Sequence, residues 1–457
     1  MDLFKNLILN ADSYKYSQPY QYPPGTESVY SYIESRGGKW DETVFFGLQM
    51  FLKEYMSKPI TQEDIDVAEE IITAHGEPFY RELWEYILKE HNGWLPVIIK
   101  AVPEGTVVPT KNVLVTIEPT DPKCWWLSSF LETALLRAVW YPTTVCTNSY
   151  TSKRIILEYL HKTGNPDLID FKLQDFGFRG VSSYESAGIG GAAHLVNFKG
   201  TDTVAALLYA RKYYDAKMAG FSIPASEHSS MVSWGRENEV EAYRNMLKLF
   251  GKPGAVLAVV SDSYNIYDAC SKLWGTELKD EVINSGAVVG IRPDSGDSPQ
   301  VVAECLRILD EHFGHTINDK GYKVLNNVSV IQGDGINQAT IDRILYRATT
   351  AGFSADNITF GQGGGLLQQV DRDTLKFAMK CSAAKVNGEW RDVYKQPITD
   401  FGKESKKGRV TLYKTENGFV TDIEGALDYP IALQTVFENG QLHNLVDFET
   451  VRSRVTF

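Results

Sequence analysis

Seven short apolar runs between residues 170 and 365 each end in a cluster of charged residues and glycines. The clusters lie at residues 175–179, 199–202, 226–228, 261–263, 292–296, 333–335 and 361–365. Stretches with helical spacing, such as 301–313 and 338–349, separate most of them. Strands that alternate with helices and carry polar residues at their C-terminal ends predict a β/α barrel whose rim holds the functional site.

An open doubly wound sheet is the alternative, because it also collects polar residues at its strand ends. Such a sheet usually concentrates its ligand groups at one switch point. Seven polar strand ends of similar character therefore favour a closed rim over the open sheet.

The remainder of the chain predicts a second, mixed α/β domain. Residues 1–145 combine strand-like runs with helical ones, and the acid-rich segment 61–90 is typical of a solvated helical insertion. The expected strands here are 28–34, 95–101 and 113–117, and the expected helices are 45–55, 62–74 and 79–90. After residue 370 the pattern changes to antiparallel strands, at 390–396, 409–413 and 418–421, with Asn-Gly turns. We expect 1–145 and 371–457 to form one unit beside a catalytic barrel of 146–370.

Composition excludes several classes of protein. A net charge of −12 argues against a general nucleic-acid binder. No apolar stretch reaches the roughly 20 residues that a membrane helix needs, and the first residues lack a signal-peptide pattern. The five cysteines have no CxxC pair and no metal-ligand spacing, so we expect reduced, mostly buried thiols in a cytoplasmic protein. They are Cys124, Cys146, Cys270, Cys305 and Cys381.

The side chains of the predicted rim suit an anionic substrate. Gly363-Gly364-Gly365 and Gly333-Asp334-Gly335 can offer backbone N–H groups to a phosphate, although plain turns would need the same residues. Four cations could add charge, and each could equally form a surface salt bridge: Arg179, Arg292, Arg372 and Lys380.

Carboxylates and one histidine complete this set of candidates. Asp262, Asp294 and Asp334 follow strands and could hold ribose hydroxyls or Mg²⁺. Helix N-capping is the alternative for Asp262 and Asp294. His228 could be a base, a ligand or a helix-start residue, and the pattern does not decide. No Ser-His-Asp elbow, zinc motif or P-loop is present.

The motifs resemble those of the nicotinamide phosphoribosyltransferases, a type II phosphoribosyltransferase family. The resemblance runs in order from about residue 10 to residue 440. It rests on Asp12-Ser13-Tyr14-Lys15, Asp175-Phe176-Gly177-Phe178-Arg179, Asn197-Phe198-Lys199-Gly200-Thr201-Asp202, Glu227-His228-Ser229, Ser261-Asp262-Ser263, Arg292-Pro293-Asp294-Ser295-Gly296, Gln332-Gly333-Asp334-Gly335 and Gly363-Gly364-Gly365-Leu366-Leu367. It implies an irregular, incomplete β/α barrel with an additional mixed domain, in a homodimer whose sites lie at the subunit interface.

The implied reaction joins nicotinamide to phosphoribosyl pyrophosphate, giving nicotinamide mononucleotide and pyrophosphate, with Mg²⁺ as cofactor and ATP as co-substrate or activator. By resemblance Phe176 and a partner's Tyr14 stack on the pyridine ring, Asp202 faces the carboxamide, and Arg292 lies beside ring and ribose. His228 is the implied site of phosphorylation by ATP.

The other implied roles concern ribose, phosphates and metal. Asp294 and Asp334 lie near the ribose, and Gly363 and Gly364, with Gly333, form the loops around the phosphate. Arg179 contacts the phosphate side, as do Arg372 and Lys380 of the other subunit. Asp262 and Asp294 lie beside Mg²⁺–pyrophosphate. Ala378 stands where the family leads us to expect a serine near the phosphates, so one hydrogen bond is expected to be missing.

The chemistry agrees with the absence of a nucleophile–base pair. The pyridine nitrogen already carries a free lone pair, so displacement at the ribose carbon requires no proton removal. The site must instead align ring and sugar and stabilise the leaving pyrophosphate.

Two alternatives remain open. A nicotinate-specific relative of the same fold should place a cation, without an opposing carboxylate, at position 202. A non-catalytic nucleotide-binding protein would not need His228, Asp294 and the glycine loops. Asp202 could also merely cap the helix that follows it.

Overall fold

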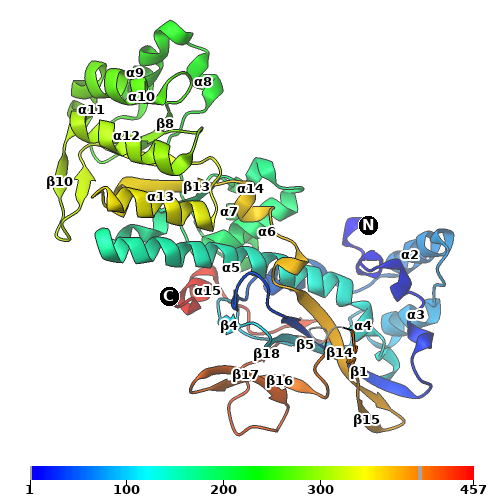
Figure 1. Cartoon of the computed structure of the whole chain (residues 1–457). Helices are drawn as coiled ribbons and strands as arrows, with labels where there is room; N and C mark the ends of the chain where they lie inside the picture. The colour runs from blue at the N-terminus through cyan, green and yellow to red at the C-terminus, as the bar shows by residue number, and fades with distance from the viewer. Residues whose placement is uncertain (1–2, 400–403) are drawn as a thin grey trace. The chain divides into compact units, whose positions relative to one another are not determined.

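The computed structural model describes residues 3–399 and 404–457 and divides into two compact units (Figure 1). The mixed unit comprises Met1–Thr147, Tyr213–Asp215 and Asp371–Thr456. The barrel unit comprises Asn148–Lys212, Ala216–Val370 and Phe457. Within the described residues, no helix is long and apolar enough to cross a membrane.

Six parallel strands form the sheet of the barrel unit, in the order β7-β6-β13-β12-β9-β8. Their bounds are β6 Leu173–Asp175, β7 Gly200–Thr201, β8 Val256–Val260, β9 Val288–Arg292, β12 Val328–Gln332 and β13 Ile358–Gln362. Segment 221–226 pairs with β7 through a bridge at Phe221 and with β8 through a bridge at Ala225. The sheet therefore curls into a ring completed by one irregular member, which confirms the irregular β/α barrel and not the open sheet.

Helices surround this ring. The main ones are α6 Tyr184–Leu195, α7 Val204–Tyr214, α9 Glu239–Phe250, α12 Ser298–Phe313 and α13 Gln338–Thr350, while α5 Glu132–Thr163 runs from the mixed unit into the barrel unit. Helices α12 and α13 lie side by side (Figure 1). Asn337 caps α13 with its side chain, and Pro299 stands in the first turn of α12, where its missing N–H has no cost.

One predicted strand is wrong. The apolar run that precedes the 199–202 cluster, residues 193–198, is one of the seven runs interpreted as strands, but it completes α6 and the turn after it, and the strand is the two-residue β7. The run contains a single β-branched residue, Val196, and its first half continues the helix that Ser183 caps by accepting from the Ser186 N–H.

The sheet of the mixed unit has seven strands in the order β15-β14-β1-β5-β3-β18-β19. Their bounds are β1 Thr26–Ser35, β3 Val97–Ala101, β5 Val113–Pro119, β14 Phe377–Val386, β15 Glu389–Asp392, β18 Gln434–Glu438 and β19 Gln441–Leu442. β1 pairs with β14 on one side and β5 on the other, all antiparallel. Both ends of the chain thus build one sheet, as expected for the additional mixed domain.

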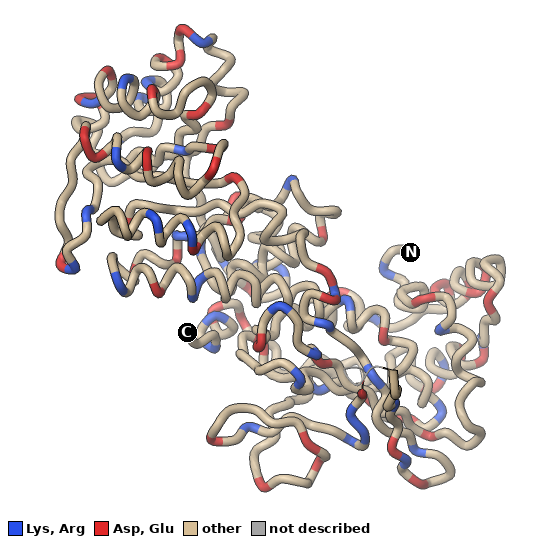
Figure 2. The backbone as a smooth tube through the Cα atoms, in the orientation of Figure 1, with Lys and Arg blue, Asp and Glu red and all other residues tan. Residues whose placement is uncertain are grey.

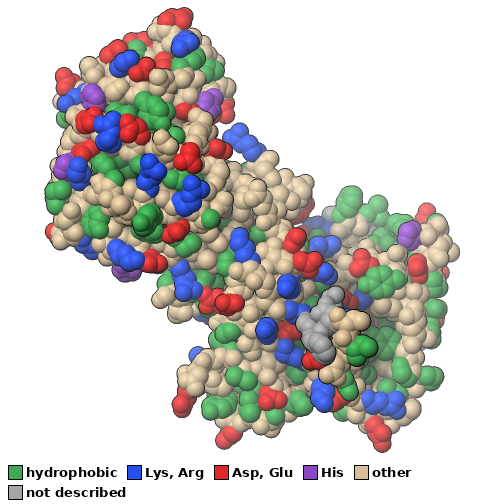
Figure 3. Space-filling view, in the orientation of Figure 1, with side chains coloured by type: hydrophobic (Ala, Val, Ile, Leu, Met, Phe, Trp, Pro, Cys, Tyr) green, Lys and Arg blue, Asp and Glu red, His purple; other side chains and the backbone are tan. Residues whose placement is uncertain are grey.

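Smaller elements of the mixed unit follow the predicted pattern. The helical insertion is α2 Gln62–His75 and α3 Arg81–Glu90, and the late hairpin is β16 Val410–Thr415 with β17 Gly418–Ile423. The turns at Asn387-Gly388 and Asn439-Gly440 have positive φ at both residues, which suits the tight connection of two antiparallel strands. Acidic and basic residues are interspersed along the backbone of both units (Figure 2), and charged and hydrophobic side chains are mixed on the visible face in Figure 3.

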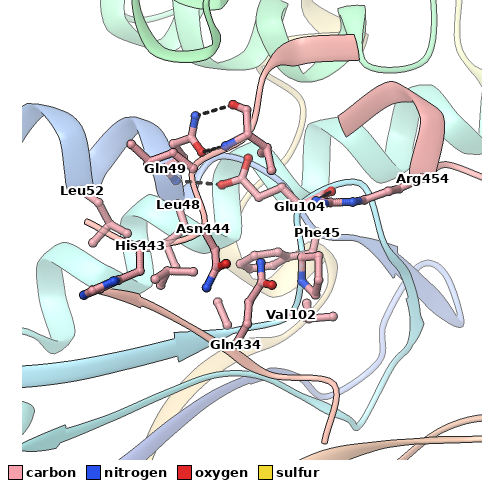
Figure 4. Close-up of a pocket in the computed structure, with 15 residues that line it drawn as sticks. Phe45, Leu48, Gln49, Leu52, Val102, Glu104, Gln434, His443, Asn444 and Arg454 are labelled. Carbon is pink, nitrogen blue, oxygen red and sulfur yellow. Dashed lines mark hydrogen bonds between the residues drawn. The ribbon is translucent and has the colours of Figure 1, made fainter. Parts of the chain in front are cut away.

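A buried carboxylate joins several segments of the mixed unit. Glu104 is almost fully buried and accepts hydrogen bonds from the Gln49 backbone N–H at 2.7 Å and the Tyr214 hydroxyl at 2.6 Å (Figure 4 shows the first). The Gln49 side chain in turn donates to the carbonyls of Tyr213 and Val446. Burial raises the pKa of Glu104, although these donors oppose the rise.

We predict that Glu104 makes the protein less stable as pH rises. Because its pKa is raised in the folded state, the folded protein binds the proton more tightly than the unfolded chain, so this contribution to stability is lost above the ordinary value of 4.5. The free energy of unfolding should therefore fall more steeply with rising pH in wild type than in Glu104→Gln, measured by urea unfolding from pH 4.5 upward. Tyr214→Phe should deepen the loss by about 1–3 kcal/mol, because one donor to the buried carboxylate is removed. Parallel pH profiles for wild type and Glu104→Gln would contradict the prediction.

Candidate active site

The site begins at the paired ends of β6 and β7. Asp175 lies opposite Thr201, so the next residues, Phe176 and Asp202, leave neighbouring strands at the same edge. The Asp202 backbone N–H donates to the Asp175 carbonyl at 2.9 Å. The Asp202 side chain accepts a hydrogen bond from the Ser222 hydroxyl at 2.6 Å. Among the described residues Asp202 makes no capping bond to α7, so the capping interpretation is wrong.

Two glycines make room for the ring of Phe176. A methyl group on Gly361 of β13 would come within 2.0 Å of Phe176 Cε2, and one on Gly333 would come within 3.6 Å of the ring. The Gly333 position is also 3.3 Å from Asp294 Oδ1. The ring therefore lies across the ends of β13 and β12, close to the carboxylate that follows β9.

Asp175 supports the turn that carries this ring, a role that sequence reasoning missed. Its Oδ1 accepts a hydrogen bond from the Gly177 N–H at 2.7 Å, and its Oδ2 has no partner among the described residues. Burial raises the pKa of Asp175 to about 6. Asp175 belongs to the motif Asp175-Phe176-Gly177-Phe178-Arg179. Its position in the sequence does not indicate that its side chain binds the backbone N–H of Gly177.

Arg292 and Asp294 stand at the end of β9. Their Nη2 and Oδ2 atoms are 3.7 Å apart, and Arg292 Nε is buried without a hydrogen-bond partner among the described residues. A buried guanidinium N–H without a partner costs free energy unless a ligand or water accepts its hydrogen bond. The pair thus leaves a donor available beside the Phe176 ring.

His228 and Asp262 form a hydrogen-bonded pair between two neighbouring members of the ring. His228 Nε2 lies 2.8 Å from Asp262 Oδ1, and the Ser295 hydroxyl donates to Asp262 Oδ2 at 2.6 Å. Burial alone would raise the pKa of Asp262, but the bonds from Ser295 and His228 outweigh it and lower that pKa. The Asp262 side chain is only 6% exposed and that of His228 is 45% exposed, so the carboxylate orients an accessible imidazole.

Neither Asp262 nor Asp294 caps a helix. The cap of α10 Ile266–Asp268 is Asn265, and the residue before α12 is Asp297. The capping alternatives for Asp262 and Asp294 are therefore wrong, and both carboxylates face the strand ends.

The two glycine loops are adjacent, because β12 and β13 pair directly. A methyl group on Gly364 would meet no atom within 4 Å, and one on Gly363 would meet only the Phe176 carbonyl oxygen, at 3.8 Å. Beneath the loops, Gln332 Oε1 and both amide atoms of Gln362 are buried without a partner among the described residues. The loops are thus accessible from outside and rest on unsatisfied polar groups.

The remaining candidates divide between the units. Arg179 and Asp334 are exposed at strand ends of the barrel unit, and Arg179 makes no hydrogen bond or ion pair with the described residues. Tyr14, Arg372 and Lys380 belong to the mixed unit. Ala378 of β14 also belongs to it and pairs with Glu34 of β1. Tyr14 is 53% exposed, Arg372 contacts Asp373, and burial lowers the pKa of Lys380.

The donor set suits a hard cation. Asp262 and Asp294 supply carboxylate oxygens at the ends of neighbouring strands, which is the ligand type that Mg²⁺ prefers. Asp294 Oδ1 makes no hydrogen bond to the described residues, so an oxygen is available. These residues fit the ligand chemistry of Mg²⁺.

Comparisons with known proteins identify the family. Residues 171–441 match the model described as the Nicotinate phosphoribosyltransferase (NAPRTase) family, and residues 6–99 match Nicotinamide phosphoribosyltransferase, N-terminal domain. The chain is 56% identical to a nicotinamide phosphoribosyltransferase of Xanthomonas campestris, covering 99% of this chain and 98% of the relative. It is 33% identical to one of Acinetobacter baylyi, covering 98% and 96%. The chain therefore belongs to this phosphoribosyltransferase family, which confirms the resemblance.

Solved structures agree on the fold. Nicotinate-nucleotide pyrophosphorylase from Pyrococcus furiosus has a TM-score of 0.66 at 16% identity and covers 100% of this chain and 95% of its own. Human nicotinic acid phosphoribosyltransferase has a TM-score of 0.57 at 14% identity, covering 100% and 92%. At such identities the likeness shows the shared barrel and additional domain alone.

We predict that Gly361→Ala displaces the ring of Phe176. The new methyl group would overlap the ring, so the side chain must move and the free energy of unfolding should fall by about 1–3 kcal/mol, as in other overpacked sites. Gly364→Ala is the matched control, because its methyl group meets open space. A crystal structure and urea unfolding of both variants check this, and an unmoved ring in Gly361→Ala would refute it.

Proposed function

We propose that this protein is a nicotinamide phosphoribosyltransferase that makes nicotinamide mononucleotide and pyrophosphate from nicotinamide and phosphoribosyl pyrophosphate, a step of NAD salvage. The observation that carries the proposal is the 56% identity, over nearly the whole chain, to a protein of that name. The match of residues 6–99 to a nicotinamide phosphoribosyltransferase domain supports it further.

The neighbouring ends of β6 and β7 suit the pyridine substrate. The Phe176 ring offers an apolar face, and an aromatic contact contributes about 0.5–1.5 kcal/mol beyond area burial. Asp202 leaves the strand beside it, and its carboxylate can accept the amide N–H of nicotinamide. Ser222 holds one Asp202 oxygen, so the other is available to the substrate.

The sugar and its phosphates fit the rest of the rim. We assign the ribose to Asp294 and Asp334, and the 5′-phosphate to the open loop at Gly363 and Gly364, beside Gly333. Arg179, exposed in the barrel unit, supplies a phosphate-side cation. We assign Arg292 to a position beside the ring and the ribose, where its unpaired Nε would donate to a substrate oxygen.

Displacement at the ribose carbon proceeds without a general base, because the pyridine nitrogen attacks with its own lone pair. The bond from this nitrogen to the carbon forms as the bond to pyrophosphate breaks. Mg²⁺, when bound at Asp262 and Asp294, would neutralise charge on the pyrophosphate. The protein residues align the reactants and exclude alternative orientations of the ring.

His228 is the residue that we assign to ATP. Asp262 accepts from its Nε2, which fixes the tautomer and leaves the lone pair on Nδ1. Almost half of the imidazole is exposed, so a nucleotide can reach it. Transfer of the terminal phosphoryl group to the ring nitrogen would release ADP and place new negative charge beside the pyrophosphate position.

The assembly that we propose is a homodimer in the cytoplasm, with a catalytic domain of 146–370 and a mixed domain of 1–145 with 371–457. Tyr14, Arg372 and Lys380 belong to the mixed unit, and family resemblance assigns them to a partner's site. Cys124, Cys270, Cys305 and Cys381 are free thiols, in keeping with a reducing compartment.

Synthesis assays test the function directly. Purified protein with phosphoribosyl pyrophosphate, Mg²⁺ and nicotinamide should form the mononucleotide, and nicotinate should be a far poorer substrate. Two like charges about 4 Å apart at an effective dielectric near 20 repel by about 4 kcal/mol, or roughly three decades in relative efficiency. Preference for nicotinate would favour the other named activity of the family.

Asp202→Asn removes that charge while keeping the hydrogen bond to Ser222 possible. It should raise the ratio of nicotinate to nicotinamide kcat/KM at least tenfold. Asp334→Asn is the matched control, because this carboxylate follows a different strand and should change both substrates alike. An unchanged ratio in Asp202→Asn would remove the specificity argument.

His228→Ala should lose ATP-stimulated synthesis and the phosphorylated enzyme while keeping ATP-independent turnover. Asp262 remains in this variant, so loss of coupling would report the imidazole itself. Radiolabelled ATP and the ratio of ADP to mononucleotide formed provide the measurement. If the variant still hydrolyses ATP in step with synthesis, another residue accepts the phosphoryl group.

A further inference from the structure

A histidine, an aspartate and a cysteine meet in the mixed unit. One ligand atom from each of His91, Asp121 and Cys124 lies within 4.8 Å of the others. His91 Nε2 is 2.7 Å from Asp121 Oδ2. The Cys124 side chain is fully buried and hydrogen-bonds to none of the described residues. None of these residues belongs to the site described above.

Local backbone structure brings the three side chains together. Asp121 caps the 3₁₀ helix η6 Pro122–Cys124 by accepting from the Lys123 N–H at 2.8 Å. Side chains three residues apart nearly eclipse on such a helix, so Asp121 and Cys124 share one side. His91 is the C-cap of α3, and the chain turns away from it through Asn92 and Gly93, both at positive φ. His91 lies 30 positions before Asp121 and 33 before Cys124, so the three residues show no short metal-ligand spacing in the sequence.

We infer that His91, Asp121 and Cys124 form a binding site for a divalent transition metal such as Zn²⁺. Imidazole, carboxylate and thiolate are the ligand types that zinc takes, whereas Mg²⁺ prefers oxygens alone. His91 and Asp121 are 26% and 18% exposed, so water can complete a four-coordinate shell. The Tyr86 hydroxyl donates to Asp121 Oδ2 at 2.8 Å, an outer hydrogen bond that orients the carboxylate.

The proton and charge balance of binding is simple. Asp121 is already ionised, because the Lys123 N–H, His91 and Tyr86 outweigh its burial and lower its pKa. Neutral His91 gives its lone pair, and the Cys124 thiol releases one proton to solvent as the metal–sulfur bond forms. Carboxylate and thiolate together neutralise the dication. Because binding releases this proton, affinity should increase as pH rises.

A bare hydrogen-bonded Asp121–His91 pair is the competing interpretation. It accounts for the 2.7 Å contact and treats the buried thiol as a packing group of the hydrophobic core. Cobalt distinguishes the two, because Co²⁺ bound by a thiolate gives a near-ultraviolet charge-transfer band that imidazole and carboxylate do not produce. The test needs neither substrate nor turnover, so it is independent of the proposed function.

Chelator-treated full-length protein should take up one Co²⁺ with this band, and Zn²⁺ should abolish it while millimolar Mg²⁺ should not. Cys124→Ser should lose the band, and His91→Gln should weaken Co²⁺ binding at least tenfold. Cys270→Ala, which removes a buried thiol of the barrel unit, should keep the charge-transfer band and the wild-type Co²⁺ affinity. Far-ultraviolet circular dichroism confirms folding of each variant.

Three results would overturn the proposal. They are no charge-transfer band in wild type, a band that persists in Cys124→Ser, and a band that is lost in Cys270→Ala. If Cys124→Ser fails to fold, His91→Gln decides, because its side chain is partly exposed and lies at a helix end. Unchanged Co²⁺ affinity in that variant counts against the site.

Discussion

Parallel pairing of β6, β7, β8, β9, β12 and β13 determines where the polar residues of this protein can act. All six strands point the same way, so their C-terminal residues gather at one edge. Segment 221–226 closes the ring by pairing with β7 and β8, and this closure brings Ser222 to Asp202 and His228 to Asp262. Each of the seven members of the ring contributes residues to this edge. Loss of closure would separate the ring-binding and histidine ends of this edge.

The rim could be predicted from the sequence where a strand is apolar and ends abruptly. β8, β9, β12 and β13 are strands of this kind. The sequence therefore placed Asp262, Arg292, Gly333 and Gly363 at or just after the ends of these strands. β7 could not be found in this way, because two residues carry no periodicity and the first half of the apolar run before it belongs to α6. Hydrogen bonds such as Ser222–Asp202 depend on the three-dimensional closure of the ring.

The site residues divide by the kind of signal that they leave. Glycines that allow close approach, such as Gly361 beside Phe176, are visible in sequence only as part of a glycine-rich stretch. The anchoring role of Asp175 depends on a bond to a backbone N–H two residues later, which no composition rule reports. The His91 cluster combines residues from a helix end and a distant 3₁₀ turn. Sequence reasoning therefore finds the chemistry that is local and misses what folding assembles.

The central position of β1 in the sheet of the mixed unit has a consequence for biosynthesis. β1 pairs with β5, which follows it early, and with β14, which the ribosome makes some 340 residues later. At roughly 5–20 residues per second, this edge of β1 waits for tens of seconds while the entire barrel unit emerges. An exposed strand edge is a template for aggregation. Nascent chains should therefore depend on chaperones most strongly between completion of β5 and arrival of β14, and slower translation would lengthen that interval.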